Sequence, residues 1–200
     1  MDQCIIFATK NEGKMKEVRE ILSDLPYRVQ SMEEAGIDID VVEDGDTFEA
    51  NAIKKAREIC EVSQSIVLAD DSGLEIDFFD QAPGVYSARY LGKDTPYSEK
   101  NAIILNRMKK VSEEERTARF VCAIAVAFPD GRTHVVRGTI EGIIGYESKG
   151  DNGFGYDPIF YVPEYGMTTS EMPPDLKNQL SHRGKALRKM KELYLSLIHI

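Results

Sequence analysis

Two adjacent aspartates close an apolar run in the segment SIVLADDSGLEI, where Asp70 and Asp71 follow Ile66 to Ala69. The plain interpretation is a turn, because Asp, Ser and Gly are common where a chain reverses. The chemical interpretation is a site, because carboxylates at the end of a buried strand must be solvated, paired or bound to a cation. If the chain stays extended here, the two side chains point to opposite faces and cannot both ligate one ion.

A second candidate is the loop TKNEGK, Thr9 to Lys14, which lies between an apolar segment and an expected helix. Free backbone amides and the helix dipole at such a position attract phosphate, and Lys10 and Lys14 add positive charge. The pattern GxxxxGK[ST] is absent, and Met15 stands where a hydroxyl would hold magnesium, so a Walker-type nucleotidase is disfavoured. The alternative is an ordinary polar loop that caps the helix.

Further acids, Glu43 and Asp44, precede the second expected helix. Carboxylates suit Mg²⁺, which typically takes one or two of them and leaves its other positions to water and substrate phosphate. One of the paired aspartates would then bind metal or activate water, and the other would pair with a lysine or with backbone amides. A solvated loop before a helix remains the alternative for Glu43 and Asp44.

Two later segments could bind a nucleotide. The stretch GDNGFGYDP places glycines around Phe154; glycines allow close backbone approach, and the ring offers a stacking surface. Lys177, His182, Arg183 and Lys185 form a basic set that could clamp phosphate or hydrogen-bond a base. In isolation the first segment is equally a tight turn with a core Phe, and the second is a solvated face.

The apolar pattern predicts the elements that must position these residues. A strand at residues 4–8 leads through the first loop into a helix, and a second helix begins at DTFEANAIKKAREIC, where Asp46 and Glu49 have capping-box spacing. Later elements are a helix at 98–110, two long strands around a Pro-Asp-Gly turn, and a closing helical segment with a break at residues 182–184. This order predicts an α/β or α+β fold, an elongated mixed sheet with flanking helices and two lobes around a central cleft.

The composition is that of an ordinary globular chain of 200 residues, 42% hydrophobic and 30% charged. The net charge of −9 argues against nucleic acid and anionic membranes as partners, so an anionic ligand would need local basic residues or a metal. The cysteines at positions 4, 60 and 122 are odd in number and widely spaced, which favours buried free thiols in a reducing compartment. We find no apolar stretch typical of a leader or a membrane span, and we expect a cytoplasmic protein.

Six motifs, in order along almost the whole chain, resemble the inosine triphosphate pyrophosphatase family, also called XTP/dITP diphosphatases. They are TKNEGK, EDGDTFEANAIKKA, LADDSGLEID, APGVYSARY, GFGYDPIF and SHRGKAL. The resemblance implies one domain over residues 1–200, usually in a homodimer, that uses Mg²⁺ to hydrolyse noncanonical purine nucleoside triphosphates (ITP, dITP, XTP) to the monophosphate and pyrophosphate. The final apolar residues, Leu195 to Ile200, extend past the family's usual end and either pack on the protein or are a non-native tail.

The resemblance also implies roles for individual residues, carried over by position. Asp71 would be the proton acceptor and a magnesium ligand, with Glu43 as the second acid at the metal, and Asp70 would brace the site or share the metal. His182 and Arg183 would lie near the 6-oxo edge of the base. The substrate-binding residues would be Thr9, Lys10, Asn11, Glu12, Gly13, Lys14, Ser72, Phe154, Gly155, Tyr156, Asp157, Lys177, His182 and Arg183.

Two other functions remain open. A nucleotide-sensing protein could have this fold without turnover, although the intact acid set disfavours it. The same chemistry could also act on modified pyrimidine triphosphates, as in the Maf-type hydrolases, although the segments SHRG and GFGYDP favour a purine. An assay of pyrophosphate release with ITP, XTP and a modified pyrimidine triphosphate separates the three hypotheses.

Overall fold

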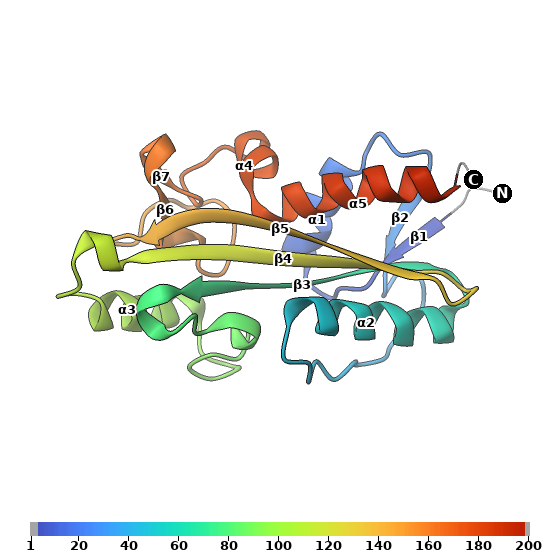
Figure 1. Ribbon diagram of the computed structural model, residues 1–200, viewed down its shortest axis with the longest axis horizontal. Coiled ribbons are helices and arrows are strands. Elements are labelled where there is room, and N and C mark those ends of the chain that lie inside the picture. The colour runs from blue at the N-terminus through green and yellow to red at the C-terminus, as the bar shows by residue number, and fades with distance from the viewer. Residues whose placement is uncertain (1–3, 199–200) are drawn as a thin grey trace. The chain divides into compact units, whose positions relative to one another are not determined.

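The computed structural model describes residues 4–198. Seven strands in this range form one mixed sheet (Figure 1). The strands follow the order β2-β1-β3-β4-β5-β6-β7. Their bounds are β1 Cys4–Phe7, β2 Arg28–Ser31, β3 Ile66–Ile76, β4 Thr117–Ala127, β5 Thr133–Ile144, β6 Phe160–Val162 and β7 Met167–Thr168. Strand β1 is parallel to β2 and β3, whereas β6 is antiparallel to β5 and β7, so the predicted mixed sheet is confirmed.

Five α-helices accompany this sheet in the described residues, which confirms the predicted α/β class with flanking helices. Their bounds are α1 Glu12–Ile21, α2 Phe48–Ser63, α3 Tyr97–Arg107, α4 Pro174–Leu180 and α5 His182–Ile198. The predicted hairpin is also present, because β4 and β5 are joined by a tight turn in which the Phe128 N–H donates to the Arg132 carbonyl at 2.9 Å. Gly131 adopts a positive φ of 91° in this turn, a conformation that glycine reaches without strain.

The chain divides into two compact units. Unit 1 takes in the described residues of Met1–Asp71, Cys122–Gly138 and His182–Ile200, and unit 2 takes in Ser72–Val121 and Thr139–Ser181. The phosphate-loop candidate and the paired aspartates therefore belong to unit 1, whereas the glycine-rich segment belongs to unit 2. The single domain over residues 1–200 and the central cleft stay predictions.

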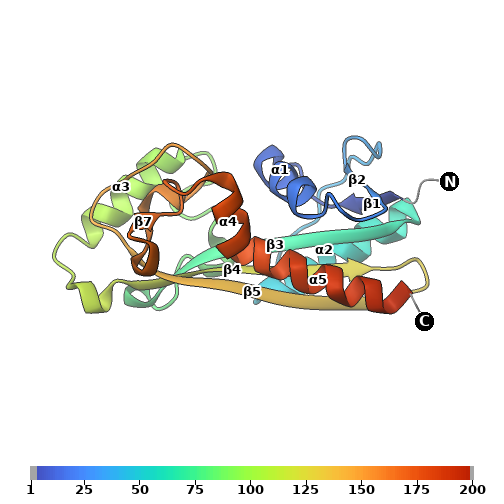
Figure 2. The ribbon, with the colours of Figure 1, turned by 90° about the horizontal axis from the view of Figure 1, so that it is seen from above.

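Helices cover both faces of the sheet in unit 1 (Figures 1 and 2). On one face, α1 and α5 contribute Met15, Val18 and Leu187 to a core that also contains Leu68 from β3. On the other face, α2 buries Phe48, Asn51, Ala52, Ala56, Ile59 and Cys60. The helix expected after the first loop is thus confirmed as α1, and helices cover the sheet of unit 1 on both sides.

The first turn of α5 packs closely on β5 at Gly138. A Cβ at Gly138 would lie 2.3 Å from the His182 carbonyl oxygen and 2.6 Å from the Ala186 nitrogen, so only a glycine permits this approach. At the other end of α5, Leu197 packs against the core of unit 1, which agrees with the interpretation that the apolar end packs on the protein. Ile200, the last residue of that segment, lies outside the described residues.

Unit 2 has a separate core, formed largely by side chains of α3, β4, β5 and β6. Arg116, only 1% exposed, lies beside this core and donates hydrogen bonds to the carbonyl oxygens of Met108 and Ile144, both at 2.6 Å, and of Gly145. Burial lowers the pKa of Arg116, and the carbonyl dipoles and the Tyr146 ring compensate for its charge. Arg116 thereby ties the end of α3 to the end of β5.

Two sequence predictions were wrong in detail, and one alternative is excluded. The excluded alternative is a turn at the paired aspartates, because β3 continues through them from Ile66 to Ile76. The cap of α2 is Thr47 rather than Asp46, since the Thr47 hydroxyl accepts the Ala50 N–H at 3.1 Å. The break near the C-terminus lies at Ser181 rather than at residues 182–184, because Ser181 is extended while His182 already begins α5.

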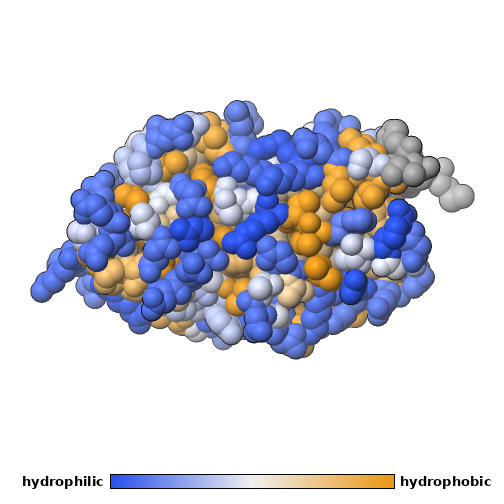
Figure 3. Space-filling view, in the orientation of Figure 1, coloured by the Kyte–Doolittle hydropathy of each residue, from blue (hydrophilic) through white to orange (hydrophobic). Residues whose placement is uncertain are grey.

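The surface is mainly hydrophilic on the face shown in Figure 3, in keeping with a chain of which 30% is charged. Within residues 4–198, no helix combines the length and the apolar character that crossing a bilayer requires. The three cysteines are free thiols; Cys60 and Cys122 are buried, and Cys4 is partly buried, which agrees with the expectation of unpaired cysteines.

Candidate active site

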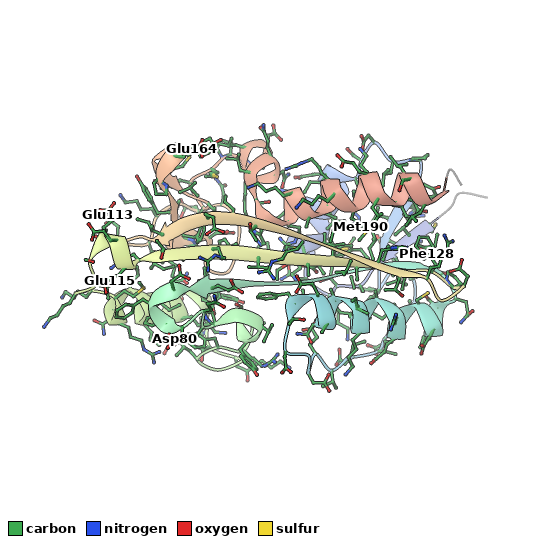
Figure 4. The ribbon with its side chains drawn as sticks, in the orientation of Figure 1. Asp80, Glu113, Glu115, Phe128, Glu164 and Met190 are labelled. Atoms are coloured by element: carbon green, nitrogen blue, oxygen red, sulfur yellow. The ribbon has the colours of Figure 1, made fainter. Side chains whose placement is uncertain are left out.

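Buried acids are rare in this protein. Among residues 4–198 only Asp70, Asp71 and Asp157 are buried carboxylates. By contrast, acids such as Asp80, Glu113, Glu115 and Glu164 are exposed at the surface of unit 2 (Figure 4). Burial of a carboxylate requires a compensating partner or shifts its pKa, so the three buried acids are the places where chemistry is to be sought.

Asp70 faces the side of the sheet that α1 and α5 cover, and it lies among cations. The Lys14 Nζ is 2.9 Å from Asp70 Oδ2, and the Arg183 Nη2 is 3.4 Å from the same oxygen. Burial raises the pKa of Asp70, but Lys14, Arg183 and Lys55 outweigh it and hold that pKa well below its usual range. Asp70 is therefore an ionised brace for two cations rather than a proton acceptor.

Arg183 is shared between two acids of unit 1. It pairs with Glu17 of α1 as well as with Asp70, and its side chain is 3% exposed. Although burial lowers the pKa of Arg183, the two carboxylates raise it above its usual value. Lys14, Glu17, Asp70 and Arg183 thus form a charge-balanced cluster that fixes Lys14 at the start of α1.

Asp71 faces the opposite side of the sheet, where α2 lies. Its Oδ2 accepts a hydrogen bond from Asn51 Nδ2 at 2.9 Å, and the residue is 7% exposed. Burial, reinforced by the Glu43 carboxylate, raises the pKa of Asp71 to about 6, although the Asn51 hydrogen bond lowers it. The alternation predicted for an extended chain is present, and it gives the neighbouring acids opposite properties: the pKa of Asp70 is held low, and the pKa of Asp71 is raised.

Glu43 and Asp71 fit the demands of a magnesium ion. No group of three or more His, Cys, Asp or Glu side chains converges within residues 4–198, so an all-protein metal cage is not formed in that part of the chain. Mg²⁺ does not need one, because it usually takes one or two carboxylates and completes its shell with water and substrate phosphate. The repulsion that Glu43 exerts on Asp71 is the kind that a divalent cation relieves.

Lys55 holds the Glu43 side of this site. It pairs with Glu43. Burial lowers the pKa of Lys55, but Asp70, Glu43 and Asp71 raise it by more, so the net shift is upward. Lys55 therefore stays protonated and supplies one positive charge beside three acids. In the same loop, the exposed Asp44 pairs with Lys54 at 2.6 Å, which favours the solvated-loop interpretation for that acid.

The phosphate-loop candidate is ordered by its own polar side chains. The Asn11 Oδ1 caps α1 by accepting the Lys14 N–H at 3.0 Å, and the Thr9 hydroxyl accepts the Asn11 N–H at 3.1 Å. Thr9 and Asn11 were expected to bind phosphate; in the structure their side-chain oxygens also organise the loop at the N-terminus of α1. Lys10 turns away and pairs with Asp40 at 2.8 Å, whereas Lys14 points toward Asp70.

A cavity of about 950 Å³ lies beside this loop, between α1 and the segment at residues 31–38. Thr9, Lys10 and Glu12 form part of its wall, but Lys14, Asp70 and Asp71 do not. This cavity therefore is not the acid site. The acid site is identified by its buried charged residues instead.

Unit 2 holds the third buried acid in a different setting. Asp157 Oδ2 is 2.8 Å from the Lys177 Nζ and accepts the Phe154 N–H at 2.8 Å, while its Oδ1 accepts the Thr169 hydroxyl at 2.9 Å. Gly153 has a φ of 77°, and a Cβ there would lie 2.3 Å from Asp157 Oδ2, so a glycine is required. Every oxygen of Asp157 is thus occupied by a protein donor.

The aromatic residues of the glycine-rich segment differ in exposure. The Phe154 ring is 36% exposed and lies 5.1 Å from the Lys177 Nζ, which leaves a surface that a planar base could contact. Tyr156 is buried; its hydroxyl donates to the Ser87 carbonyl at 2.7 Å, and the Tyr97 ring meets it edge-on. Asn101 of α3 donates to the Gly155 carbonyl at 3.1 Å, so α3 supports the segment from behind.

The predicted site residues fall into two sets, one in each unit. Unit 1 contains Thr9, Lys10, Asn11, Glu12, Gly13, Lys14, Glu43, Asp71, His182 and Arg183. Unit 2 contains Ser72, Phe154, Gly155, Tyr156, Asp157 and Lys177. Within the sets, Lys14 and Arg183 meet at Asp70, and Lys177 meets Asp157, whereas Lys10 lies apart with Asp38 and Asp40.

Three residues of the site were not predicted from the sequence: Glu17, Asn51 and Lys55. A signal was present in each case, because Glu17 lies three residues after Lys14, and Asn51 and Lys55 lie four apart on a predicted helix. Polar residues at that spacing share a helix face. On α2 this pair interrupts the apolar stripe at the end that approaches the acids.

Comparisons with known proteins agree with the motif resemblance. Residues 5–193 match the Ham1 family. A dITP/XTP pyrophosphatase of Desulforamulus reducens is 49% identical over 94% of this chain and 94% of its own, and one of Bacillus subtilis is 46% identical over 94% and 95%. Among solved structures, a HAM1 protein from Coxiella burnetii matches with a TM-score of 0.88 at 38% identity, covering 97% of this chain and 99% of that one. The chain therefore belongs to the Ham1 family.

Proposed function

We propose that this protein is a Mg²⁺-dependent nucleoside triphosphate pyrophosphatase that hydrolyses noncanonical purine nucleotides such as ITP, dITP and XTP to the monophosphate and pyrophosphate. Relatives at 44 to 49% identity carry the name dITP/XTP pyrophosphatase and match over nearly their whole length, which supports the substrate class. The observation that carries the proposal is the unequal pair on β3: Asp70 is ionised and paired with Lys14 and Arg183, whereas Asp71 accepts one amide hydrogen bond and has a pKa of about 6.

The reaction consumes one water molecule and breaks the α,β anhydride bond. Asp71 takes a proton from the attacking water, the remaining hydroxyl bonds to the α-phosphorus, and pyrophosphate leaves. Mg²⁺ held by Asp71 and Glu43 would supply charge neutralisation at the phosphate oxygens. Lys14 and the N-terminus of α1 would bind phosphate oxygens, and Asp70 would hold Lys14 in place for that role.

For base recognition we propose the residues that the resemblance implies. Phe154 offers an exposed ring for stacking, with Lys177 fixed beside it. His182 and Arg183 are assigned to the 6-oxo edge, where a hydrogen-bond donor would meet the keto oxygen of ITP but not the amino group of ATP. Because Arg183 already pairs with Glu17 and Asp70, we expect His182 to carry more of this selectivity.

We further propose that the enzyme works as a homodimer in the cytoplasm, without nucleic acid or a membrane as partner. The net charge of −9 supports the latter point, since it repels polyanionic surfaces. Light scattering on the eluting peak of a sizing column measures the assembly directly, and a mass equal to one chain would contradict the dimer.

The function is tested by pyrophosphate release from a panel of nucleotides. With Mg²⁺ we expect turnover of ITP, dITP and XTP at a kcat/KM at least about 100-fold above that of ATP, and loss of turnover in EDTA that added Mg²⁺ restores. Nucleotide binding without release would favour the sensing protein, and preferred turnover of a modified pyrimidine triphosphate would favour the Maf-type specificity. Release of single phosphates instead of pyrophosphate would contradict the reaction type.

A further inference from the structure

Asn51 is a fully buried polar side chain on the first turn of α2, and it contacts two separate parts of the acid site. Its Nδ2 donates to Asp71 Oδ2 at 2.9 Å. Its Oδ1 accepts the Gly45 N–H at 2.7 Å. A single amide therefore joins the carboxylate on β3 to the loop that carries Glu43, although twenty residues separate Asn51 from Asp71.

The Gly45 contact determines which way the amide faces. A backbone N–H can only donate, so the atom of Asn51 that meets it must be the oxygen, and the nitrogen must then face Asp71. Asp71 thus receives a hydrogen bond on Oδ2. Its other oxygen, Oδ1, is left as the atom for a water proton or a metal ion, so Asn51 gives the two carboxylate oxygens different roles.

The loop can reach Asn51 only because residue 45 is a glycine. A Cβ at Gly45 would lie 2.8 Å from Asn51 Oδ1 and 3.0 Å from the Ala50 Cβ. Glu43 lies two residues earlier in this loop and pairs with Lys55, one helical turn beyond Asn51 on α2. The same face of α2 therefore holds the Glu43 loop at two points and Asp71 at a third.

We propose that Asn51 is a positioning residue for the reaction: its amide holds Asp71 Oδ2 and the Gly45 N–H together, and so keeps Asp71 and Glu43 at the separation that the metal ion and the attacking water require. This inference rests on the proposed function and adds to it a residue that touches neither substrate nor metal. Partners that orient metal ligands from behind typically change metal affinity or activity 10- to 100-fold when they are removed.

The variants are chosen to separate positioning from stability. Asn51→Leu keeps a buried side chain of similar volume but removes both hydrogen bonds, and Asn51→Ala removes the side chain altogether. Thr47→Ala is the matched control, because it deletes the cap of the same helix without touching Asp71 or Gly45. Circular dichroism establishes that each variant is folded before it is compared.

Two readouts are measured on each variant. The first is steady-state hydrolysis of ITP with Mg²⁺, and we expect both Asn51 variants to lose about 10- to 100-fold in kcat with a KM changed by less than about threefold. The second is Mn²⁺ binding without nucleotide, followed by electron paramagnetic resonance, and we expect a Kd raised about tenfold. Thr47→Ala should lower the midpoint of urea unfolding yet keep kcat and the Mn²⁺ Kd within about twofold.

Contrary results are equally specific. The proposal is overturned if the Asn51 variants keep the wild-type kcat and Mn²⁺ Kd. It is also overturned if Thr47→Ala lowers kcat and raises the Mn²⁺ Kd as much as the Asn51 variants do. If the Asn51 variants do not fold, the side-chain NH₂ signals of Asn51 in the wild-type spectrum decide: slow exchange with solvent and a shift on adding Mg²⁺ support the proposal, and fast exchange contradicts it. If wild-type protein releases no pyrophosphate from ITP, the proposed function fails, and the Mn²⁺ Kd values still decide the role of Asn51.

Discussion

Asp71 in unit 1 and Asp157 in unit 2 are buried to similar extents, 7% and 3% exposed, but their surroundings differ. Asp157 has a lysine, a hydroxyl and a backbone N–H around its two oxygens, so its charge is compensated within the protein. Asp71 has one amide donor and a second carboxylate nearby. Burial alone therefore does not make an acid reactive; what makes it reactive is burial without enough compensating donors.

Unit 1 and unit 2 also differ in how their charged residues are paired. In unit 1, Lys14 and Arg183 both pair with Asp70. Asp71, the next residue, has the Glu43 carboxylate nearby, which raises its pKa. In unit 2, the Lys177–Asp157 ion pair and the hydrogen bond of Tyr156 brace the glycine-rich segment, and the Phe154 side chain is 36% exposed. The first arrangement suits metal-assisted hydrolysis, and the second suits recognition of a flat ligand.

The largest effect is expected when Asp71 is altered. Asp71→Asn keeps the shape of the side chain but removes the proposed proton acceptor and metal ligand, so kcat for ITP should fall about 10³-fold. Nucleotide binding, measured by calorimetry, should survive. Retention of more than a tenth of the wild-type kcat would remove Asp71 from the chemistry.

The matched substitution in unit 2 should act on stability instead. Asp157→Asn leaves Lys177 buried without its carboxylate, and breaking a buried pair in this way costs about 3 kcal/mol of the free energy of unfolding. Urea denaturation measures this loss, and kcat for ITP should change less than about tenfold. The double variant Asp157→Asn/Lys177→Met should regain much of the stability; if it does not, the ion pair is not the cause.

The same comparison predicts that Asp71→Asn stabilises the metal-free protein. Because the pKa of Asp71 is raised from 3.8 to about 6 on folding, the folded state binds the proton more tightly, and stability falls as the pH rises from about 4 to about 6. Above that range the ionised carboxylate costs about 1 to 3 kcal/mol, which the asparagine avoids. In EDTA, the variant should be more stable than wild type at pH 8 and nearly equal to it at pH 4. An equal stability at both pH values would contradict the raised pKa.

The smallest effect concerns selectivity. His182→Ala should lower the ratio of kcat/KM for ITP to that for ATP by about tenfold, equivalent to about 1.4 kcal/mol, because it removes the donor that we propose for the 6-oxo group. Lys185→Ala, a change of an exposed neighbour on the same helix, is the control. If His182→Ala leaves the ratio unchanged, His182 has no part in base recognition.

Local patterns predicted much of this molecule because the forces involved act over short stretches of chain. The helix α1 and the opposite directions of Asp70 and Asp71 follow from the periodicities of helix and strand, and the β4–β5 hairpin follows from its Pro-Asp-Gly turn. The alternative of a turn at Asp70 is excluded because lysine and arginine partners from α1 and α5 let the strand continue through two acids. A rule that considers only neighbouring residues cannot predict such partners, because they are distant in sequence.

The site shows the same limit. Asp71 and Glu43 stand out by residue type, but Asn51 and Lys55 become significant only when α2 places them against β3 and the loop before α2. Similarly, Thr47 and Asp46 are both plausible caps by composition, and the hydroxyl that reaches the Ala50 N–H decides between them. What could not be predicted is which of several suitable side chains the packed structure brings into contact.

The most direct test of the account is the pKa of the Asp71 carboxyl group in the folded protein. Carbon-13 NMR of labelled aspartates, assigned with Asp71→Asn, follows this titration in EDTA and again with Mg²⁺ present. We expect a pKa of about 6 without metal and a clear decrease when Mg²⁺ is added. A pKa close to the unperturbed 3.8 that does not respond to Mg²⁺ would contradict the claim that Asp71 is the reactive acid of this site.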